Sequence, residues 1–181
     1  MSSPVLERAR SVIGLGILYR LGKGGYDPKA AVPGARMVDV MPPRIYRGLD
    51  CSGFVAWCLG ISRDPGRNKK NPALANMPIA SWPRWVESTN IWTDATGPQT
   101  AWVEVPLKEA MPGDVLVYPD YKNLLGHHCE GHVAILADPA RRTIVDCSSS
   151  QSKAHGQAID ERPGDFFWRK PATRAVRLRG A

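Results

Sequence analysis

The amino-acid sequence predicts an α+β fold, with helices in the first part of the chain and an antiparallel sheet in the second. Pro4 is expected to open an N-terminal helix, and a second, apolar helix is expected from Cys51 to about Ile61. From Trp102 onward, short alternating or apolar runs are separated by turn residues, which is typical of strands. Helices followed by strands, without internal repeats, indicate the α+β class.

The length and composition suit one compact domain over residues 1–181, because 43% of the residues are hydrophobic. The formal charge of +7 is spread along the chain in short groups, so it predicts attraction to polyanions without selecting one kind. No long basic run with interleaved aromatic residues is present, and we therefore expect neither nucleic-acid binding nor a nucleic-acid partner. The four cysteines form no Cys-x-x-Cys pair and are expected to be free thiols, in a protein that we expect to be a monomer.

Three segments between the expected helices and strands are less regular. Residues 22–48 are rich in glycine and proline and are expected to form a long loop that lines a site. Residues 64–78 are polar, basic and broken by prolines, which favours a surface loop. Residues 81–86 are expected to open a short helix, whose tryptophans belong either to the core or to the wall of a groove.

The second half contains the expected strands. A turn at Met111–Gly113 leads into one of them, a loop over residues 119–130 precedes another, and a tight turn at Asp138–Arg141 joins two of them into a hairpin. The expected strands lie at Trp102–Val105, Asp114–Tyr118, His132–Leu136, Thr143–Cys147, near Gln157–Ile159, and at Arg174–Leu178.

Cys51 is the candidate nucleophile. Asp50 is a good N-cap residue, and Ser52 and Gly53 are small enough to leave the first helical turn open. Cys51 would then lie over unpaired backbone N–H groups at the positive end of the helix, an environment that favours a reactive thiolate. The alternative is that Cys51 is a buried apolar residue, the usual position of a free cysteine. Catalysis would require a base from elsewhere in the chain.

His132 is the candidate base. A turn centred between Pro139 and Ala140 would place His132 opposite Cys147 in the hairpin, and a shift of one residue would place it opposite Asp146. Asp146 is chemically the better partner, because a carboxylate that accepts from one ring nitrogen leaves the other to take the thiol proton. The alternative is a histidine that is merely hydrogen-bonded within the core.

Four segments together resemble the NlpC/P60 cysteine peptidases, which cut peptide bonds in bacterial cell-wall peptides. The four are, in chain order, Tyr19–Gly22, Asp50–Val55, Pro112–Val115 and Gly131–Ile135. They are similar to the family's tyrosine-bearing segment, its nucleophile motif, its strand-entry motif and its histidine motif. The resemblance covers Tyr19 to about Ser148, which is most of the chain.

The resemblance implies a papain-like domain in which the helix that carries the cysteine packs on an antiparallel sheet that carries the histidine. Carried over to this sequence, Cys51 is the nucleophile, His132 the general base and then acid, and Tyr19 a helper near the thiol and the oxyanion. The segment between the tyrosine and cysteine motifs is longer here than in the family, so Tyr26 or Tyr46 is an alternative to Tyr19.

The third catalytic residue departs from the family pattern, in which it is often His, Asn or Gln. At the matching place this chain has Asp146, followed by Cys147. We favour Asp146, and Cys147 stays an alternative because some interbacterial amidases of this type use a cysteine. The implied reaction is hydrolysis of the bond between γ-D-glutamate and the diamino acid in a peptidoglycan stem peptide, with no cofactor and no metal.

Three rival interpretations of the sequence stay open. The segment His127–His132 packs four metal-ligand types into six residues, although its spacing fits none of the usual zinc patterns. A non-catalytic wall-binding module on the same fold is the second rival. The third keeps the thiol chemistry and directs it to another amide, as in related amidases and acyl transferases.

The sequence also predicts a location. The longest apolar run, Val12–Tyr19, is too short to span a bilayer, which takes about 20 residues. Arg20 and Lys23 follow it without a small-residue cleavage site, so we expect neither a Sec signal nor a membrane anchor. A protein of this kind would be made in the cytoplasm and would reach the cell wall or periplasm by lysis, on a phage particle or by a secretion machine. A delivered antibacterial toxin would have delivery machinery and a cognate immunity protein as partners.

Overall fold

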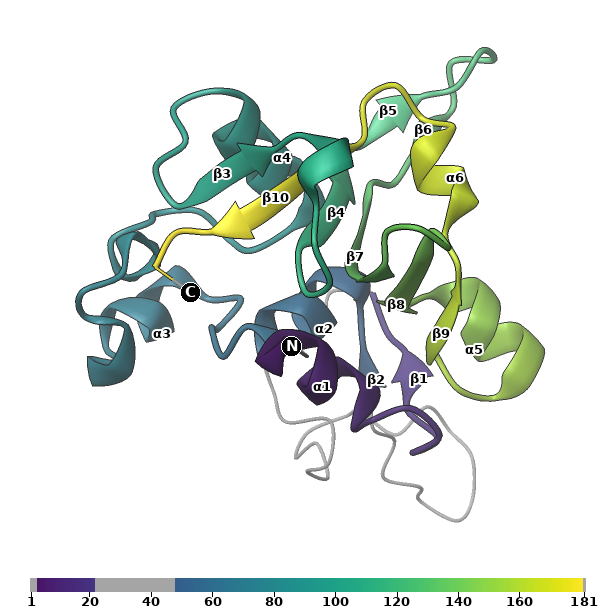
Figure 1. Cartoon of the computed structure of the whole chain (residues 1–181), viewed down its shortest axis with the longest axis horizontal. Helices are drawn as coiled ribbons and strands as arrows, with labels where there is room; N and C mark the ends of the chain where they lie inside the picture. Colours follow the sequence, from purple (N-terminus) through teal and green to yellow (C-terminus); the bar gives the residue numbers. More distant parts are fainter. Residues whose placement is uncertain (1–2, 22–47, 181) are drawn as a thin grey trace.

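A six-stranded antiparallel sheet forms the centre of the structure, a computed structural model that describes residues 3–21 and 48–180 (Figure 1). The strand order is β3-β10-β4-β7-β8-β9, and each strand is antiparallel to its neighbours. The fold is therefore α+β, as predicted. The strands are β3 (Trp102–Val105), β4 (Val115–Tyr118), β7 (His132–Asp138), β8 (Thr143–Cys147), β9 (Ile159–Pro163) and β10 (Arg174–Leu178).

The two faces of the sheet are covered by different elements. Helices α1 (Pro4–Arg10) and α2 (Cys51–Cys58) pack against β7 and β8 on one face, where Phe54 belongs to the same buried cluster as Val133. The short helix α6 (Asp165–Trp168) covers the other face through Phe167. Successive side chains of a strand point to opposite faces, so Asp146 and Cys147 at the end of β8 lie on different faces of the sheet.

The remaining elements lie around this core. Helix α4 (Ser88–Thr96) packs beside β3 and β4, and α5 (Ser149–His155) lies next to β9 (Figure 1). Strands β1 (Leu18–Tyr19) and β2 (Gly48–Leu49) form a parallel pair, and β5 (Tyr121–Lys122) and β6 (His128–Cys129) form a projecting hairpin inside the expected loop 119–130. The sequence patterns did not predict α5, α6 or this hairpin.

Helix α2 begins at Cys51, as predicted, because Asp50 caps it. The buried Asp50 carboxylate accepts a hydrogen bond of 2.8 Å from the Gly53 N–H and is paired with the Arg63 guanidinium at 2.5 Å. All eight residues of the helix are buried. The helix ends at Cys58, earlier than the expected Ile61, since Gly60 adopts a left-handed conformation with φ +72° that terminates the helical path.

The polar segment 64–78 is more regular than the predicted surface loop. It contains helix α3 (Pro65–Lys69), the 3₁₀ turn η1 (Pro72–Leu74) and the start of η2 (Pro78–Ala80); a further 3₁₀ turn, η3 (Leu107–Glu109), follows β3. Prolines occupy the first turn of α3, η1 and η2, where a missing N–H costs no helical hydrogen bond. The expectation of a plain loop was therefore wrong, because the prolines open short helices here.

The helix expected at residues 81–86 was also wrong, since the helix begins at Ser88. Pro83 disfavours helical geometry for the residue before it, which keeps this stretch extended. Of its two tryptophans, Trp82 is buried and packs edge-on against Trp102 with ring centroids 6.4 Å apart, whereas Trp85 is 53% exposed.

The apolar run Val12–Tyr19 contributes to the core and to β1. Val12 and Ile17 are buried beside α2, and the run ends in Tyr19, which pairs with Leu49 of β2. No helix within residues 3–21 and 48–180 has the length and apolar content that crossing a bilayer requires. The expected loop 22–48 lies almost entirely outside the described residues, as do Tyr26 and Tyr46.

Candidate active site

Cys51 lies at the start of α2, against the wall of a cleft of about 160 Å³. Its side chain is almost buried, with the residue 8% exposed. The cleft is also lined by Tyr19 and Ser52 and by residues from the base of the β5–β6 hairpin, among them Glu130 and Gly131. The thiol is therefore at the positive end of a buried helix and borders a space that solvent can enter.

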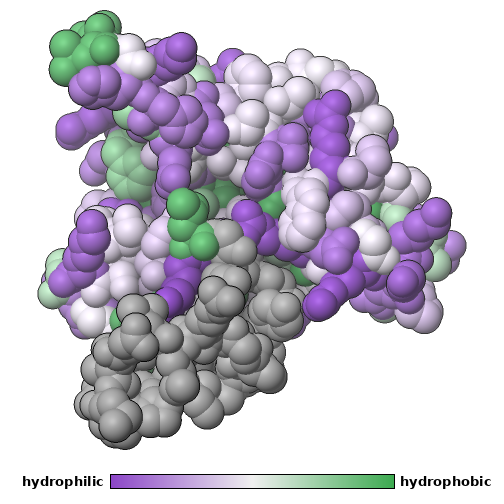
Figure 2. All heavy atoms as spheres, turned by 180° about the vertical axis from the view of Figure 1, so that it is seen from behind, coloured by the Kyte–Doolittle hydropathy of each residue, from purple (hydrophilic) through white to green (hydrophobic). Residues whose placement is uncertain are grey.

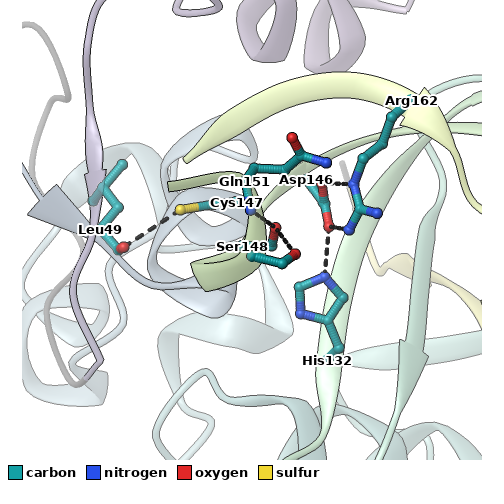
Figure 3. Close-up of polar contacts among 8 residues, drawn as sticks. Leu49, His132, Asp146, Cys147, Ser148, Gln151 and Arg162 are labelled. Carbon is teal, nitrogen blue, oxygen red and sulfur yellow. Dashed lines mark hydrogen bonds and ion pairs between the residues drawn. The ribbon is translucent and has the colours of Figure 1, made fainter. Parts of the chain in front are cut away.

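His132 is the first residue of β7 and has partners on both sides of its ring. Its Nε2 lies 2.8 Å from Oδ2 of Asp146 (Figure 3). A second side-chain hydrogen bond joins the ring to Cys51. Because Nε2 is occupied by Asp146, Nδ1 is the nitrogen that serves Cys51. The ring also stacks on Phe167, with centroids 5.7 Å apart and an angle of 26° between the planes, which restricts its rotation.

Glycine is required directly before His132 for steric reasons. A Cβ atom at Gly131 would lie 2.5 Å from the Ser88 hydroxyl and 2.7 Å from the Tyr118 carbonyl oxygen. The N–H of Gly131 donates to the Asp120 carboxylate at 2.6 Å. The close approach of these segments positions the start of β7, and His132 with it.

The predicted pairing of His132 across the hairpin was wrong. The observed register pairs Ile135 with Val145 and Leu136 with Ile144, and it shifts again before Asp138. Continued toward the cleft, this register brings Asp146 level with Ala134, two residues from His132. The His132 and Asp146 side chains lie on the same face and meet diagonally, which is within reach of a long side chain.

Asp146 and Cys147 point to opposite faces of β8, as the alternation of a strand requires (Figure 3). The Asp146 carboxylate faces His132, whereas the buried Cys147 thiol donates to the Leu49 carbonyl oxygen at 3.3 Å. Burial raises the pKa of Cys147, and the negative charges of Cys51 and Asp146 add to this. Of the two candidates, Asp146 is the one in hydrogen-bond contact with His132.

Sequence reasoning missed Arg162, which is a second partner of Asp146. Its Nε donates to Oδ1 at 2.9 Å and its Nη2 to Oδ2 at 2.7 Å, so the carboxylate is held by a two-pronged contact (Figure 3). Arg162 lies in β9, level with Ile144 of β8. The sequence offered only an arginine a few residues beyond the strand expected near Gln157–Ile159, and an arginine in such a place usually faces solvent.

The buried charges shift the pKa values of this group of residues. Burial alone would lower the pKa of His132, but the hydrogen bonds to Asp146 and Cys51 and the negative charges of both raise it to about 9. Burial opposes ionisation of Asp146, but hydrogen bonds from His132 and Arg162 outweigh it and lower the pKa of this carboxyl group. Near neutral pH, His132 is therefore favoured as an imidazolium beside the Asp146 carboxylate.

Tyr19 lies beside the thiol, on the cleft wall. Its backbone N–H donates to the Ser152 hydroxyl at 3.1 Å, which ties β1 to α5. Burial raises the pKa of Tyr19, and the neighbouring charges of Cys51 and Asp50 raise it further, so the phenol keeps its proton. The side chain is therefore a neutral hydrogen-bond donor next to Cys51.

The histidines of the segment 127–132 do not converge. His127 and His128 belong to the exposed hairpin, where His128 lies 3.3 Å from Asp120, while His132 faces Asp146. Over the ranges 3–21 and 48–180, no three His, Cys, Asp or Glu side chains gather in a way that could hold a metal ion. The β5–β6 hairpin extends beyond the cleft to an apolar tip, Leu124 and Leu125, visible at one corner of the surface (Figure 2).

A cysteine at a helix start, a histidine and a buried carboxylate thus form one hydrogen-bonded series on an α+β fold. No family model matches the sequence, and no curated protein matches it. Among solved structures, the chain is similar to a Staphylococcus aureus protein described as similar to a lipoprotein of the NLP/P60 family. The superposition covers 94% of this chain and 39% of that chain, with a TM-score of 0.43 and 16% sequence identity.

Proposed function

We propose that the protein is a cysteine peptidase or amidase with a papain-like arrangement, in which Cys51, His132 and Asp146 act together. The observation that carries the proposal is the position of His132, whose ring is bonded to the Cys51 thiol on one side and to the buried Asp146 carboxylate on the other. A histidine held only for packing would not require both a thiol and a buried carboxylate as partners of its ring. A non-catalytic binding module would not need this series either.

The mechanism follows from the order of these groups. Transfer of the Cys51 proton to His132 forms a thiolate–imidazolium ion pair before the substrate reacts, and the thiolate then attacks the carbonyl carbon of an amide. Backbone N–H groups of the first turn of α2 stabilise the oxyanion, together with the Tyr19 phenol. The protonated His132 gives its proton to the leaving amine, which departs when the C–N bond breaks. His132 then takes a proton from water, which hydrolyses the thioester and releases the free acid and the thiol.

The substrate proposed is a peptidoglycan stem peptide, cut between γ-D-glutamate and the diamino acid. The motifs around Cys51 and His132 support this choice through their resemblance to the NlpC/P60 peptidases, and the positive net charge suits an anionic wall polymer. The proposed enzyme is one catalytic domain that works without a cofactor. A delivered toxin of this kind would need delivery machinery and an immunity protein. A different amide substrate, or transfer of the acyl group to an amine, is the alternative.

Digestion of purified muropeptides tests the substrate. We expect the protein to convert tetrapeptide-bearing muropeptides into two products, one ending in γ-D-glutamate and one beginning with the free amine of the diamino acid, both identified by mass. Products of cleavage at another amide would show that the enzyme cuts that bond and not the proposed one. If folded protein leaves every muropeptide intact, the peptidoglycan assignment is wrong.

The rate should depend on pH through His132. Its pKa of about 9 lies above the ordinary value of 6.5, so the proton needed by the leaving amine is present at neutral pH and is lost above about pH 9. We expect kcat/KM to fall about tenfold per pH unit beyond that point. A pH–rate profile measures this, with circular dichroism at each pH as the control for folding. A decline centred near pH 6.5 would contradict the proposed ion pair.

A further inference from the structure

Arg162 makes the most constrained contact next to the candidate site. Its Nε donates to Oδ1 of Asp146 at 2.9 Å and its Nη2 to Oδ2 at 2.7 Å. Oδ2 also lies 2.8 Å from Nε2 of His132. Asp146 is fully buried, and the Arg162 side chain is 22% exposed. A carboxylate held at both oxygens by a planar guanidinium has a defined plane, and this plane sets where its remaining hydrogen bond points.

The guanidinium is itself held in place by its surroundings. It lies over the Phe166 ring at 5.1 Å, and Phe166 packs beside Phe167, on which the His132 ring stacks. One aromatic cluster thus supports both the arginine and the histidine that meet at Asp146. Strand β9 adds a second constraint, because Arg162 is paired with Ile144 in the register of the sheet.

We propose that Arg162 is a positioning residue, which orients the Asp146 carboxylate toward His132 and whose positive charge limits how strongly His132 holds its proton. The catalytic part of this inference rests on the proposed cysteine peptidase mechanism. The part that concerns His132 itself depends only on the geometry of the four residues in series.

The charge effect has a definite sign. The titratable groups around His132 are Cys51 on α2, Asp146 on β8 and, on β4, Tyr118, whose ring centroid lies 6.2 Å away. Two cations lie behind them: Arg162 is paired with Asp146, and Lys170 lies over the Tyr118 ring at 4.6 Å. Burial raises the pKa of Tyr118, so this side chain is neutral. Arg162 is the cation in direct contact with the carboxylate that holds the His132 proton, and removing its charge should raise the pH at which His132 loses that proton.

Two substitutions separate geometry from charge. Arg162→Lys keeps the positive charge but cannot hold both carboxylate oxygens in one plane. For this variant kcat should fall, while KM and the alkaline limb of the pH profile should stay unchanged. Arg162→Gln removes the charge as well, so the same loss should come with an upward shift of that limb by roughly one pH unit. Misplacement of a catalytic group by about 1 Å lowers the catalytic rate on the order of 10²-fold, and we expect the fall in kcat to be no larger than this.

Arg177→Gln is the matched control for stability. Arg177 holds the buried Asp114 by the same two-pronged contact, at 2.7 and 2.9 Å, but at the end of β4 away from His132. Its loss should lower the melting temperature, as the loss of Arg162 should, without changing the pH profile. If Arg162→Gln behaves like Arg177→Gln, with lower stability but unchanged kcat and pH limb in the folded fraction, the positioning role is refuted.

NMR of the imidazole groups provides a readout that needs no substrate. The protein has four histidines, and the His132 signals are assigned by their absence in His132→Gln. We expect a downfield Nε2–H proton from the bond to Asp146, which should broaden in both Arg162 variants, and a raised His132 titration midpoint only in Arg162→Gln. These changes would support the inference even if no muropeptide is cleaved. Wild-type behaviour of both variants in this experiment would overturn it, whatever the substrate.

Discussion

Cys51→Ala is expected to abolish hydrolysis, with a loss in kcat of at least about 10⁴-fold. Alanine cannot form the acyl-enzyme, and in enzymes with a nucleophile–base pair the removal of the nucleophile alone costs about as much as the removal of the whole set. The fold should persist, because alanine is small, favours helices and leaves the Asp50 cap intact. The measurement is the initial rate on the muropeptide substrate, with circular dichroism and melting temperature as evidence of folding.

Cys129→Ala is the matched control for this experiment. Cys129 is the most exposed of the four cysteines, since Cys51, Cys58 and Cys147 are buried. It lies on the β5–β6 hairpin, where its thiol donates to the His127 carbonyl oxygen at 3.8 Å. Its replacement should leave the rate within a few-fold of wild type. Near-normal turnover by folded Cys51→Ala would refute the thiol mechanism.

Asp146→Asn is expected to lower kcat by about 10²- to 10⁴-fold. An amide cannot stabilise the imidazolium, and it favours the wrong tautomer or orientation of His132, which is the effect known for the corresponding carboxylate in serine proteases. The substitution also leaves the half-buried Arg162 without its anionic partner. Breaking a buried ion pair on one side costs on the order of 3 kcal/mol, so the free energy of unfolding in urea should fall as well.

Cys147→Ser distinguishes the two candidates for the third residue. A serine hydroxyl can replace the thiol as donor to the Leu49 carbonyl oxygen, and this side chain lies on the face of β8 away from His132. We expect the variant to keep most of its activity. The opposite pattern, an active Asp146→Asn and an inactive but folded Cys147→Ser, would make cysteine the third catalytic residue.

The hairpin register shows where local reasoning is insufficient. The turn was predicted as a tight one centred between Pro139 and Ala140, but the structure pairs Asp138 with Thr143, and Arg142 adopts a left-handed conformation with φ +53°. An irregularity between Leu136 and Asp138 then shifts the pairing back by one residue, which leaves the register one residue away from the predicted one. Asp146 still meets His132, because the side-chain direction alternates along each strand and a diagonal contact suffices.

Arg162 illustrates a different limit. The last strand before the C-terminal one was expected near Gln157–Ile159, whereas β9 runs from Ile159 to Pro163. A shift of a few residues at a strand boundary moves Arg162 from a loop to a paired position beside β8. A single arginine gives no local sign of its partner, since its ion pair with Asp146 depends on how the strands are ordered in the sheet.

Local chemistry determined the parts of the site that lie within a few residues of each other. The Asp50 cap and the apolar run after it place Cys51 at a helix start, because capping and helical burial act over one or two turns. The tertiary structure decided which side chains meet that thiol. The strand order, the hairpin register and the aromatic cluster bring His132, Asp146 and Arg162 into one series, and these depend on contacts between residues far apart in the chain.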